Sequence, residues 1–169
     1  MDKHFELTDK FIINAFGVKL FQIKCTRKIK YADIGDLGGY IEKEDNLSGN
    51  AWVYGDARVY GNARVSGDAW VYGNAWVFGD ARVSGDAQVS GDARVSNDNE
   101  HCGFDCFGSA NRHTHSYKTK SGKIEITCGC FRGSIEEFEK QIKETHRGNE
   151  FERQYIAIVE VIKIKFGLK

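Results

Sequence analysis

Residues 47–96 have the sequence LSGNAWVYGDARVYGNARVSGDAWVYGNAWVFGDARVSGDAQVSGDARVS, in which one six-residue unit repeats almost without interruption. Each unit holds a Val, then Ser or an aromatic residue, Gly, Asp or Asn, Ala, and finally Arg, Trp or Gln. The Val positions lie six apart from Val53 to Val95, as do the Ala positions from Ala51 to Ala93. A hexad with one large and one small apolar residue predicts a β-helix of stacked coils.

The predicted β-helix is a three-sided prism in which three hexads make one coil. Residues eighteen apart should therefore lie above one another. Val should point inward and Ala should fill a crowded inward position, while Gly with Asp or Asn makes the turn. Gly and Asn suit this turn because they tolerate left-handed backbone angles. Ile41 lies six residues before Leu47, which places the expected start of the coils near Ile41.

The flanking segments predict two caps. Apolar and polar residues alternate over 18–24, and a short apolar run covers 11–13, with Gly17 as the break between two strands. Beyond the repeat, residues 116–127 predict a hairpin on a Gly-containing turn. The expected domains are an N-terminal β cap at 1–40, the β-helix at 41–98 and a C-terminal cap at 99–169.

Two helices should complete the C-terminal cap. Ser134 and Glu137 form a capping box that opens the first helix, which should end near Gly148. Asn149 can cap the second helix, in which apolar residues recur at helical spacing. The prediction is a mainly β chain with about three coils and a ββαα C-terminal cap.

Composition restricts the classes of partner. The 24 basic and 24 acidic residues give zero net charge, so no global field attracts duplex nucleic acid or an anionic membrane. The sequence lacks the apolar core of a signal peptide and any stretch of membrane-spanning length, which leads us to expect a cytoplasmic protein. Without a secretion signal, the five cysteines are expected to be reduced thiols.

The outward residues of the hexads define three different faces. The first, strongly aromatic face stacks Trp52, Tyr54, Trp70 and Tyr72 with Gln88 and Ser90. The second, which we call the cationic face, stacks Arg58, Tyr60, Trp76, Phe78, Arg94 and Ser96. The third, solvated face stacks Ser48, Arg64, Ser66, Arg82 and Ser84.

The first face and the cationic face both carry aromatic side chains. Together they expose more apolar surface than a soluble monomer usually tolerates. Either the terminal segments fold back over these faces, or identical chains pack prism against prism about a three-fold axis. Of the two, the homotrimer is favoured here. Its interface is expected to contain Trp52, Tyr54, Trp70, Tyr72 and Phe78.

The cationic face is also a candidate binding site. Arg58, Tyr60, Trp76 and Arg94 can hold a planar anionic ligand, because stacking and guanidinium contacts grip nucleotides and single-stranded bases. Packing at a protein interface is the more common use of such residues. Outside the repeat, Asn111 and Arg112 suit phosphate, although they equally suit a hairpin turn.

No strong signature of catalysis or metal binding interrupts the chain. The repeat contains no histidine, whereas many hexapeptide-repeat acyltransferases work through one. A cluster of His101, Cys102, Cys106, His113, His115, Cys128 and Cys130 suggests zinc, but it lacks the usual C-x-x-C spacing. The alternation of Asp and Asn in the turns favours turn chemistry over calcium binding. We therefore expect no metal, no cofactor and no catalytic residues.

Several segments resemble small hexapeptide-repeat proteins of bacteriophages and bacteria. They are FGVKLFQIK at 16–24, LGGYIEKEDNLS at 37–48, GSANRHTHSYKTK at 108–120, CGCFRGSIEEFE at 128–139 and KETH at 143–146. The hexads themselves resemble those of left-handed parallel β-helix proteins. These resemblances imply a left-handed β-helix and a phage context, and they supply no catalytic residues.

The resulting functional hypothesis is a non-catalytic, oligomeric binding protein. In a phage context it would be a counter-defence factor that captures a host defence protein or a signalling nucleotide. The alternatives are an acyltransferase of the hexapeptide-repeat class and a structural assembly protein.

Overall fold

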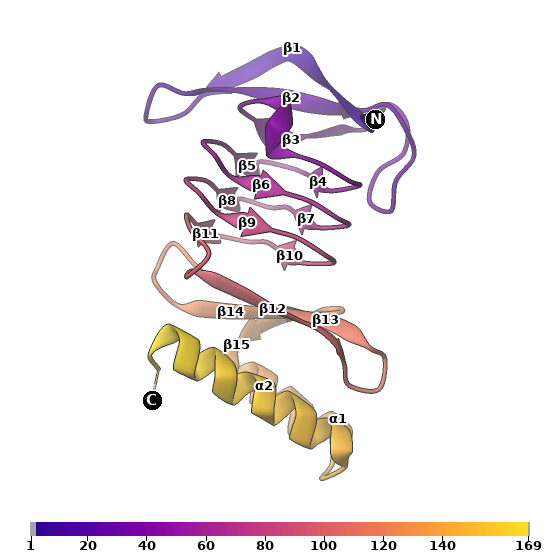
Figure 1. Cartoon of the computed structure of the whole chain (residues 1–169), viewed down its shortest axis with the longest axis vertical. Helices are drawn as coiled ribbons and strands as arrows, with labels where there is room; N and C mark the ends of the chain where they lie inside the picture. The colour runs from indigo at the N-terminus through magenta and orange to yellow at the C-terminus, as the bar shows by residue number, and fades with distance from the viewer. Residues whose placement is uncertain (1–2, 169) are drawn as a thin grey trace. The chain divides into compact units, whose positions relative to one another are not determined.

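A computed structural model describes residues 3–168. The chain divides into two compact units, the first ending at Asp98 and the second beginning at Asn99. The first unit is a β-solenoid of about three stacked coils with additional antiparallel strands (Figure 1). The second unit holds an antiparallel sheet and both helices. The chain is mainly β, as the sequence predicts.

The hexads form short parallel strands, each ending on its repeat Val. They are β4 (Trp52–Val53), β5 (Arg58–Val59), β6 (Arg64–Val65), β7 (Trp70–Val71), β8 (Trp76–Val77), β9 (Arg82–Val83), β10 (Gln88–Val89) and β11 (Arg94–Val95). Each strand pairs in parallel with the strand eighteen residues away, so that β5 pairs with β8 and β8 with β11. The three predicted faces are therefore confirmed as the stacks β4-β7-β10, β5-β8-β11 and β6-β9.

The two apolar positions of the hexad form the core of the solenoid. Every repeat Val from Val53 to Val95 is fully buried, and every repeat Ala from Ala51 to Ala93 is at most 2% exposed. Hydrogen bonds between coils join the backbone, as from the amide of Trp76 to the carbonyl of Ala93 at 2.9 Å. The repeat Gly has a positive φ in each turn, which explains why that position excludes larger residues.

The solenoid begins where the sequence predicts. Strand β3 (Leu37–Ile41) pairs in parallel with β5, and Ile41 lies opposite Val59. A 3-10 helix at Glu44–Asn46 follows. The buried side-chain amide of Asn46 donates to the carbonyl of Ala63 at 2.8 Å, which satisfies a coil carbonyl that no strand reaches.

Two antiparallel strands precede β3. Strands β1 (Phe5–Ile13) and β2 (Lys19–Cys25) extend the sheet in the order β1-β2-β3-β5-β8-β11. The sequence indicates β2 well but only the last part of β1. Polar residues interrupt the apolar pattern of β1, since five of its nine residues are exposed and only Phe5 is buried.

The second unit contains a larger sheet than the predicted hairpin. The hairpin is present as β13 (Arg112–Lys118) and β14 (Ile124–Cys128). Two further strands flank it, β12 (His101–Phe107) and β15 (Phe131–Ser134), in the order β12-β13-β14-β15. The expected ββαα segment is thus corrected to four strands and two helices. Both missed strands are short or poorly buried, so neither carries a clear alternating pattern.

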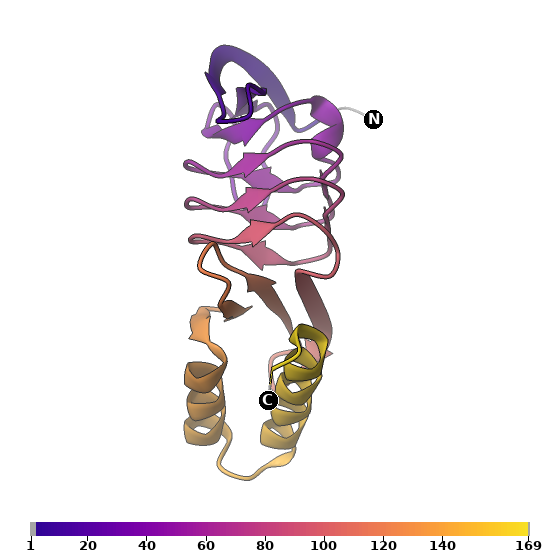
Figure 2. The same ribbon diagram turned by 90° about the vertical axis from the view of Figure 1, so that its left-hand side faces the viewer.

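The helices end and begin at the residues that the sequence indicates. Ser134 accepts from the amide of Glu137 in a capping box that opens α1 (Ile135–His146). Asn149 accepts two amides at the start of α2 (Glu150–Phe166). Figure 2 shows the helices side by side. Their apolar faces form one core with the sheet, built on Ile126, Cys128, Ile135, Phe138, Ile142, Tyr155, Ile158, Val159 and Ile162.

The stacking of the turns predicts a specific cost for enlarging a repeat glycine. Gly67 has a φ of +70°, and an added Cβ would lie 2.9 Å from the backbone nitrogen of Gly85 in the next coil. Gly17 has a φ of +78° but no heavy atom within 4 Å of such a Cβ. Gly67→Ala should lower the free energy of unfolding by ~1–3 kcal/mol more than Gly17→Ala, as measured by urea denaturation. Equal losses would contradict the close stacking of the coils.

Candidate functional site

The cationic face brings two arginines against one tryptophan. Strands β5, β8 and β11 align Arg58, Trp76 and Arg94, because each strand pairs in register with the next. The guanidinium carbon of Arg58 lies 5.0 Å from the Trp76 ring centroid, and that of Arg94 lies 4.2 Å away. Since β5 and β11 flank β8 on opposite sides, the two guanidiniums cover opposite faces of the indole.

Arg94 is held by the backbone rather than by an acid. One nitrogen of Arg94, Nη1, donates to the carbonyls of Asn74 at 2.9 Å and Ala93 at 2.7 Å. The buried Nε of Arg58 has no hydrogen-bond partner in the described part of the chain. Within residues 3–168, neither guanidinium forms an ion pair with a carboxylate.

Burial lowers the pKa of the Arg94 guanidinium, and the Arg58 charge acts in the same direction. The carboxylate of Asp92 opposes this shift. Arginine nevertheless stays protonated in proteins. The face therefore carries two positive charges, neither of which forms an ion pair with a carboxylate of residues 3–168.

This geometry changes the expected mode of binding. The sequence predicts that a planar ligand stacks on Trp76. In the structure, however, guanidinium groups occupy both faces of the Trp76 ring. A base has no free indole face on which to stack. The groups that remain available are the N–H edges of the guanidiniums, which recognise the oxygens of phosphates and carboxylates.

Tyr60, an expected ligand contact, is only 7% exposed and packs with Leu20 and Tyr40. Its ring stacks on Phe78 at a centroid distance of 5.3 Å, and its buried hydroxyl has no hydrogen-bond partner among residues 3–168. The expectation is thus corrected: Tyr60 is a buried residue whose ring meets Trp76 edge to face at 6.4 Å between centroids. Burial raises the pKa of its hydroxyl.

The first aromatic face is covered by the chain itself. Trp52, expected at an oligomer interface, is fully buried. The β3 strand passes so close that a Cβ on Gly38 would lie 2.9 Å from the Trp52 ring, and the His4 ring lies 6.3 Å away between centroids. Nε2 of His4 is 2.7 Å from the carbonyl of Ala51. Trp52 therefore cannot contribute to a surface between chains.

The loop between β2 and β3 covers the next tryptophan. Tyr31 stacks on Trp70 at 4.8 Å between nearly parallel rings, and Tyr72 stacks on Trp70 at 4.0 Å. Lys30 anchors the loop by pairing with Asp86 at 2.9 Å. Of the aromatic residues expected at the interface, Tyr54 is 52% exposed, whereas Trp70, Tyr72 and Phe78 are half-buried.

The sequence does not reveal the roles of Lys30, Tyr31 and His4. All three are contributed by segments outside the repeat, and their partners lie tens of residues away along the chain. The available signal is the density of apolar and basic residues in Lys28–Tyr31, which does not identify the face that they cover.

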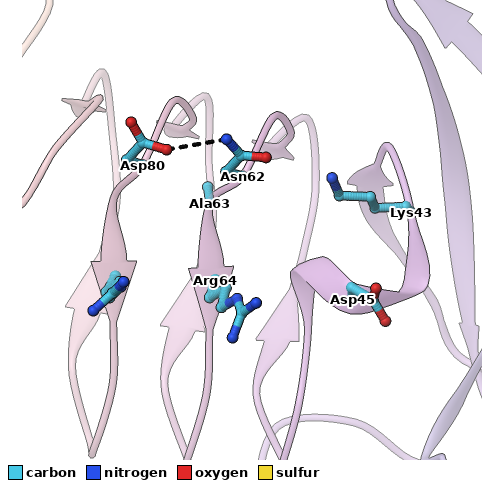
Figure 3. A pocket seen from close by; sticks show the side chains of 7 residues that line it. Lys43, Asp45, Asn62, Ala63, Arg64 and Asp80 are labelled. Carbon is cyan, nitrogen blue, oxygen red and sulfur yellow. Dashed lines mark hydrogen bonds between the residues drawn. The ribbon is translucent and has the colours of Figure 1, made fainter.

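The third face carries a polar recess of about 250 Å³ (Figure 3). It is lined by Lys43, Asp45, Asn62, Ala63, Arg64, Asp80 and Arg82. The amide of Asn62 donates to Asp80 at 3.1 Å, and Asn50 bonds Asp68 in the same way at 3.0 Å. These bonds link successive turns, and the recess mixes cations with carboxylates. It is a weaker candidate for anion binding than the cationic face.

The second unit contains the other predicted residues. Asn111 has a φ of 47° in the turn between β12 and β13, where its amide donates to the carbonyl of Gly108. This is the turn role that the sequence leaves open. Arg112 is the first residue of β13 and lines a cavity in the second unit. The two residues thus belong to a different unit from the cationic face.

In the segment rich in histidine and cysteine, two of the cysteines and two of the histidines lie on opposite faces of the sheet. Cys102 and Cys128 pack toward the helices, whereas His113 and His115 lie on the other face because side chains alternate along β13. Nδ1 of His113 pairs with Asp105 at 2.5 Å, and Nδ1 of His101 lies 3.0 Å from Nε2 of His115. Over residues 3–168, no three His, Cys, Asp or Glu side chains are arranged to hold a metal ion.

Comparison with known proteins supports the repeat architecture. Residues 57–73 and 87–98 are similar to the family described as the YdcK Beta solenoid repeat. No curated protein and no solved structure matches the chain. No helix within residues 3–168 combines the length and the apolar composition needed to cross a membrane.

Removal of the loop cover should expose Trp70. Tyr31→Ala deletes the ring stacked on Trp70, so we expect tryptophan emission at longer wavelength and a loss of ~0.5–1.5 kcal/mol from the aromatic contact. The matched control is Tyr54→Ala, which removes a tyrosine that is already exposed. Fluorescence and thermal unfolding of both variants measure the difference. If Tyr54→Ala gave the larger effects, the proposed covering role of Tyr31 would be wrong.

Proposed function

We propose that this protein is a non-catalytic binding protein on a left-handed hexapeptide β-helix. Its cationic face captures the anionic group of a host defence protein or of a signalling nucleotide. The observation that carries this proposal is the pair of guanidiniums held against Trp76 with no carboxylate partner within residues 3–168.

Trp76 has a positioning role in this proposal. Its ring holds the two arginines at a fixed separation through cation–π contacts, and the backbone bonds of Arg94 fix one of them further. A rigid pair of guanidiniums loses less side-chain entropy on binding than two free arginines would. A nucleotide would be held through its phosphates rather than through its base.

The chemistry of the face supports binding rather than catalysis. Its polar groups are guanidinium and indole N–H donors, together with the hydroxyl of Ser96 and the buried hydroxyl of Tyr60. Neither an arginine nor a tryptophan provides a proton acceptor at neutral pH. A nucleophile with an adjacent general base, the usual requirement for acyl transfer, is not formed by these residues.

Self-association is part of the proposal, with a homotrimer as the expected assembly. Since Trp52 is buried, the interface would draw on other apolar side chains. Edge strand β1 exposes 45% of Phe11 and 65% of Ile13, and the turn after it exposes 74% of Phe16. Exposed apolar side chains on a sheet edge favour association between chains. The same observation favours a structural assembly protein as the second candidate function.

The sequence resemblance supports a phage setting, in which a small binding protein without its own chemistry is suited to counter-defence. A cytoplasmic location, where host defence proteins and nucleotide signals occur, belongs to the same proposal.

Substitution of the two arginines should abolish anion capture. We expect Arg58→Gln with Arg94→Gln to weaken the binding of adenosine triphosphate or a cyclic dinucleotide by about tenfold or more, because charge-assisted hydrogen bonds are lost. The control is Arg64→Gln with Arg82→Gln, which removes equal charge from exposed arginines of the third face. Titration calorimetry at two salt concentrations measures both pairs.

Equal weakening by the two pairs would show that net charge, rather than the cationic face, governs binding. Absence of binding to every anionic probe by the unaltered protein would overturn anion capture at this face.

A further inference from the structure

The second unit contains a cavity of about 480 Å³ that the sequence does not indicate. It lies between the sheet, helix α1 and the start of α2, and its volume falls within the range of small-molecule sites. It is lined by Arg112, Cys128, Cys130, Phe131, Arg132, Phe138, Gln141, Ile142, Thr145, His146 and Tyr155.

The charge of this cavity is positive. Its lining includes two arginines and a histidine but no carboxylate. Arg132 is neutralised by Glu125, whose carboxylate accepts from its Nε at 3.0 Å. Arg112 forms no ion pair with any carboxylate of residues 3–168. A Cβ on Gly129 would lie 2.7 Å from Nη1 of Arg112, so the guanidinium lies directly over the β14–β15 turn.

Another part of the lining is aromatic and apolar. Phe131 and Phe138 lie 5.0 Å apart between ring centroids, and Phe138 meets Tyr155 edge to face at 5.8 Å. His146 stacks on Tyr155 at 5.5 Å. Burial, followed by the effect of Cys128, raises the pKa of Tyr155 to about 12, so the phenol stays neutral and adds no negative charge. An uncompensated guanidinium thus faces a cavity with aromatic walls.

We propose that this cavity binds a small organic anion with a flat apolar body. Its carboxylate or phosphate would pair with the Arg112 guanidinium, whose planar fork matches two anionic oxygens. Its ring would contact Phe131, Phe138 and Ile142. This site goes beyond the proposed function, since it uses none of the residues of the cationic face and lies in the other unit.

The exposed thiol of Cys130 reports on this cavity. Cys130 lines the cavity, whereas Cys106, which is also exposed, does not, which gives an internal control in the same unit. We expect phenyl phosphate to slow the alkylation of Cys130 by iodoacetamide several-fold and to leave Cys106 unaffected, as measured for each cysteine by mass spectrometry. Inorganic phosphate and phenol, each of which supplies one half of the ligand, should protect Cys130 less.

Arg112→Gln should reduce the apparent affinity for phenyl phosphate about tenfold. The matched control is Arg153→Gln, an exposed arginine outside the lining, which should leave protection unchanged. An unaltered alkylation rate of Cys106 in Arg112→Gln would show that the β12–β13 hairpin is intact. Protection by phenol equal to that by phenyl phosphate, full protection in Arg112→Gln, or no protection of Cys130 would each overturn the proposal.

Discussion

The hydrogen bonds between successive coils are the constraint on which the first unit depends. Each short strand pairs with the strand eighteen residues away, and this register repeats from Ile41 to Val95. Two-residue strands would be unstable alone, but the buried Val and Ala positions hold every coil at the same spacing. The register also aligns side chains outside the core. Arg58, Trp76 and Arg94 meet because they occupy one hexad position in three successive coils.

In a regular stack of coils, the outward aromatic side chains and the first coil would be exposed unless another segment covered them. The segment before the solenoid covers both within the described chain, since β2 and β3 continue the sheet and Tyr31 stacks on Trp70. This arrangement reduces the need for a neighbouring chain at the first face. It leaves the guanidiniums of the cationic face without an ion pair in the described chain, which supports the binding role proposed for that face.

The sequence predicts the solenoid well because the period determines the inward positions, the turns and the vertical stacks together. It also predicts the helix starts, because Ser134 and Asn149 act through residues within one turn. The cover of Trp52 by His4 is not predicted, because no local pattern identifies a partner 48 residues away. The sequence places Arg58, Trp76 and Arg94 above one another, but the positions of both guanidiniums over the Trp76 ring depend on side-chain conformations that a repeat does not specify.

Residue-resolved amide hydrogen exchange tests the stacked-coil organisation most directly. The amides of Arg58 and Trp76 donate to carbonyls of the next coil at 2.9 Å, whereas the turn residue Phe16 has its amide bonded only to the nearby side chain of Asn14. We expect the amides of Arg58 and Trp76 to be among the slowest of the first unit to exchange, and that of Phe16 to exchange rapidly. Exchange of the two coil amides as fast as that of Phe16 would contradict a stack held together by hydrogen bonds between coils.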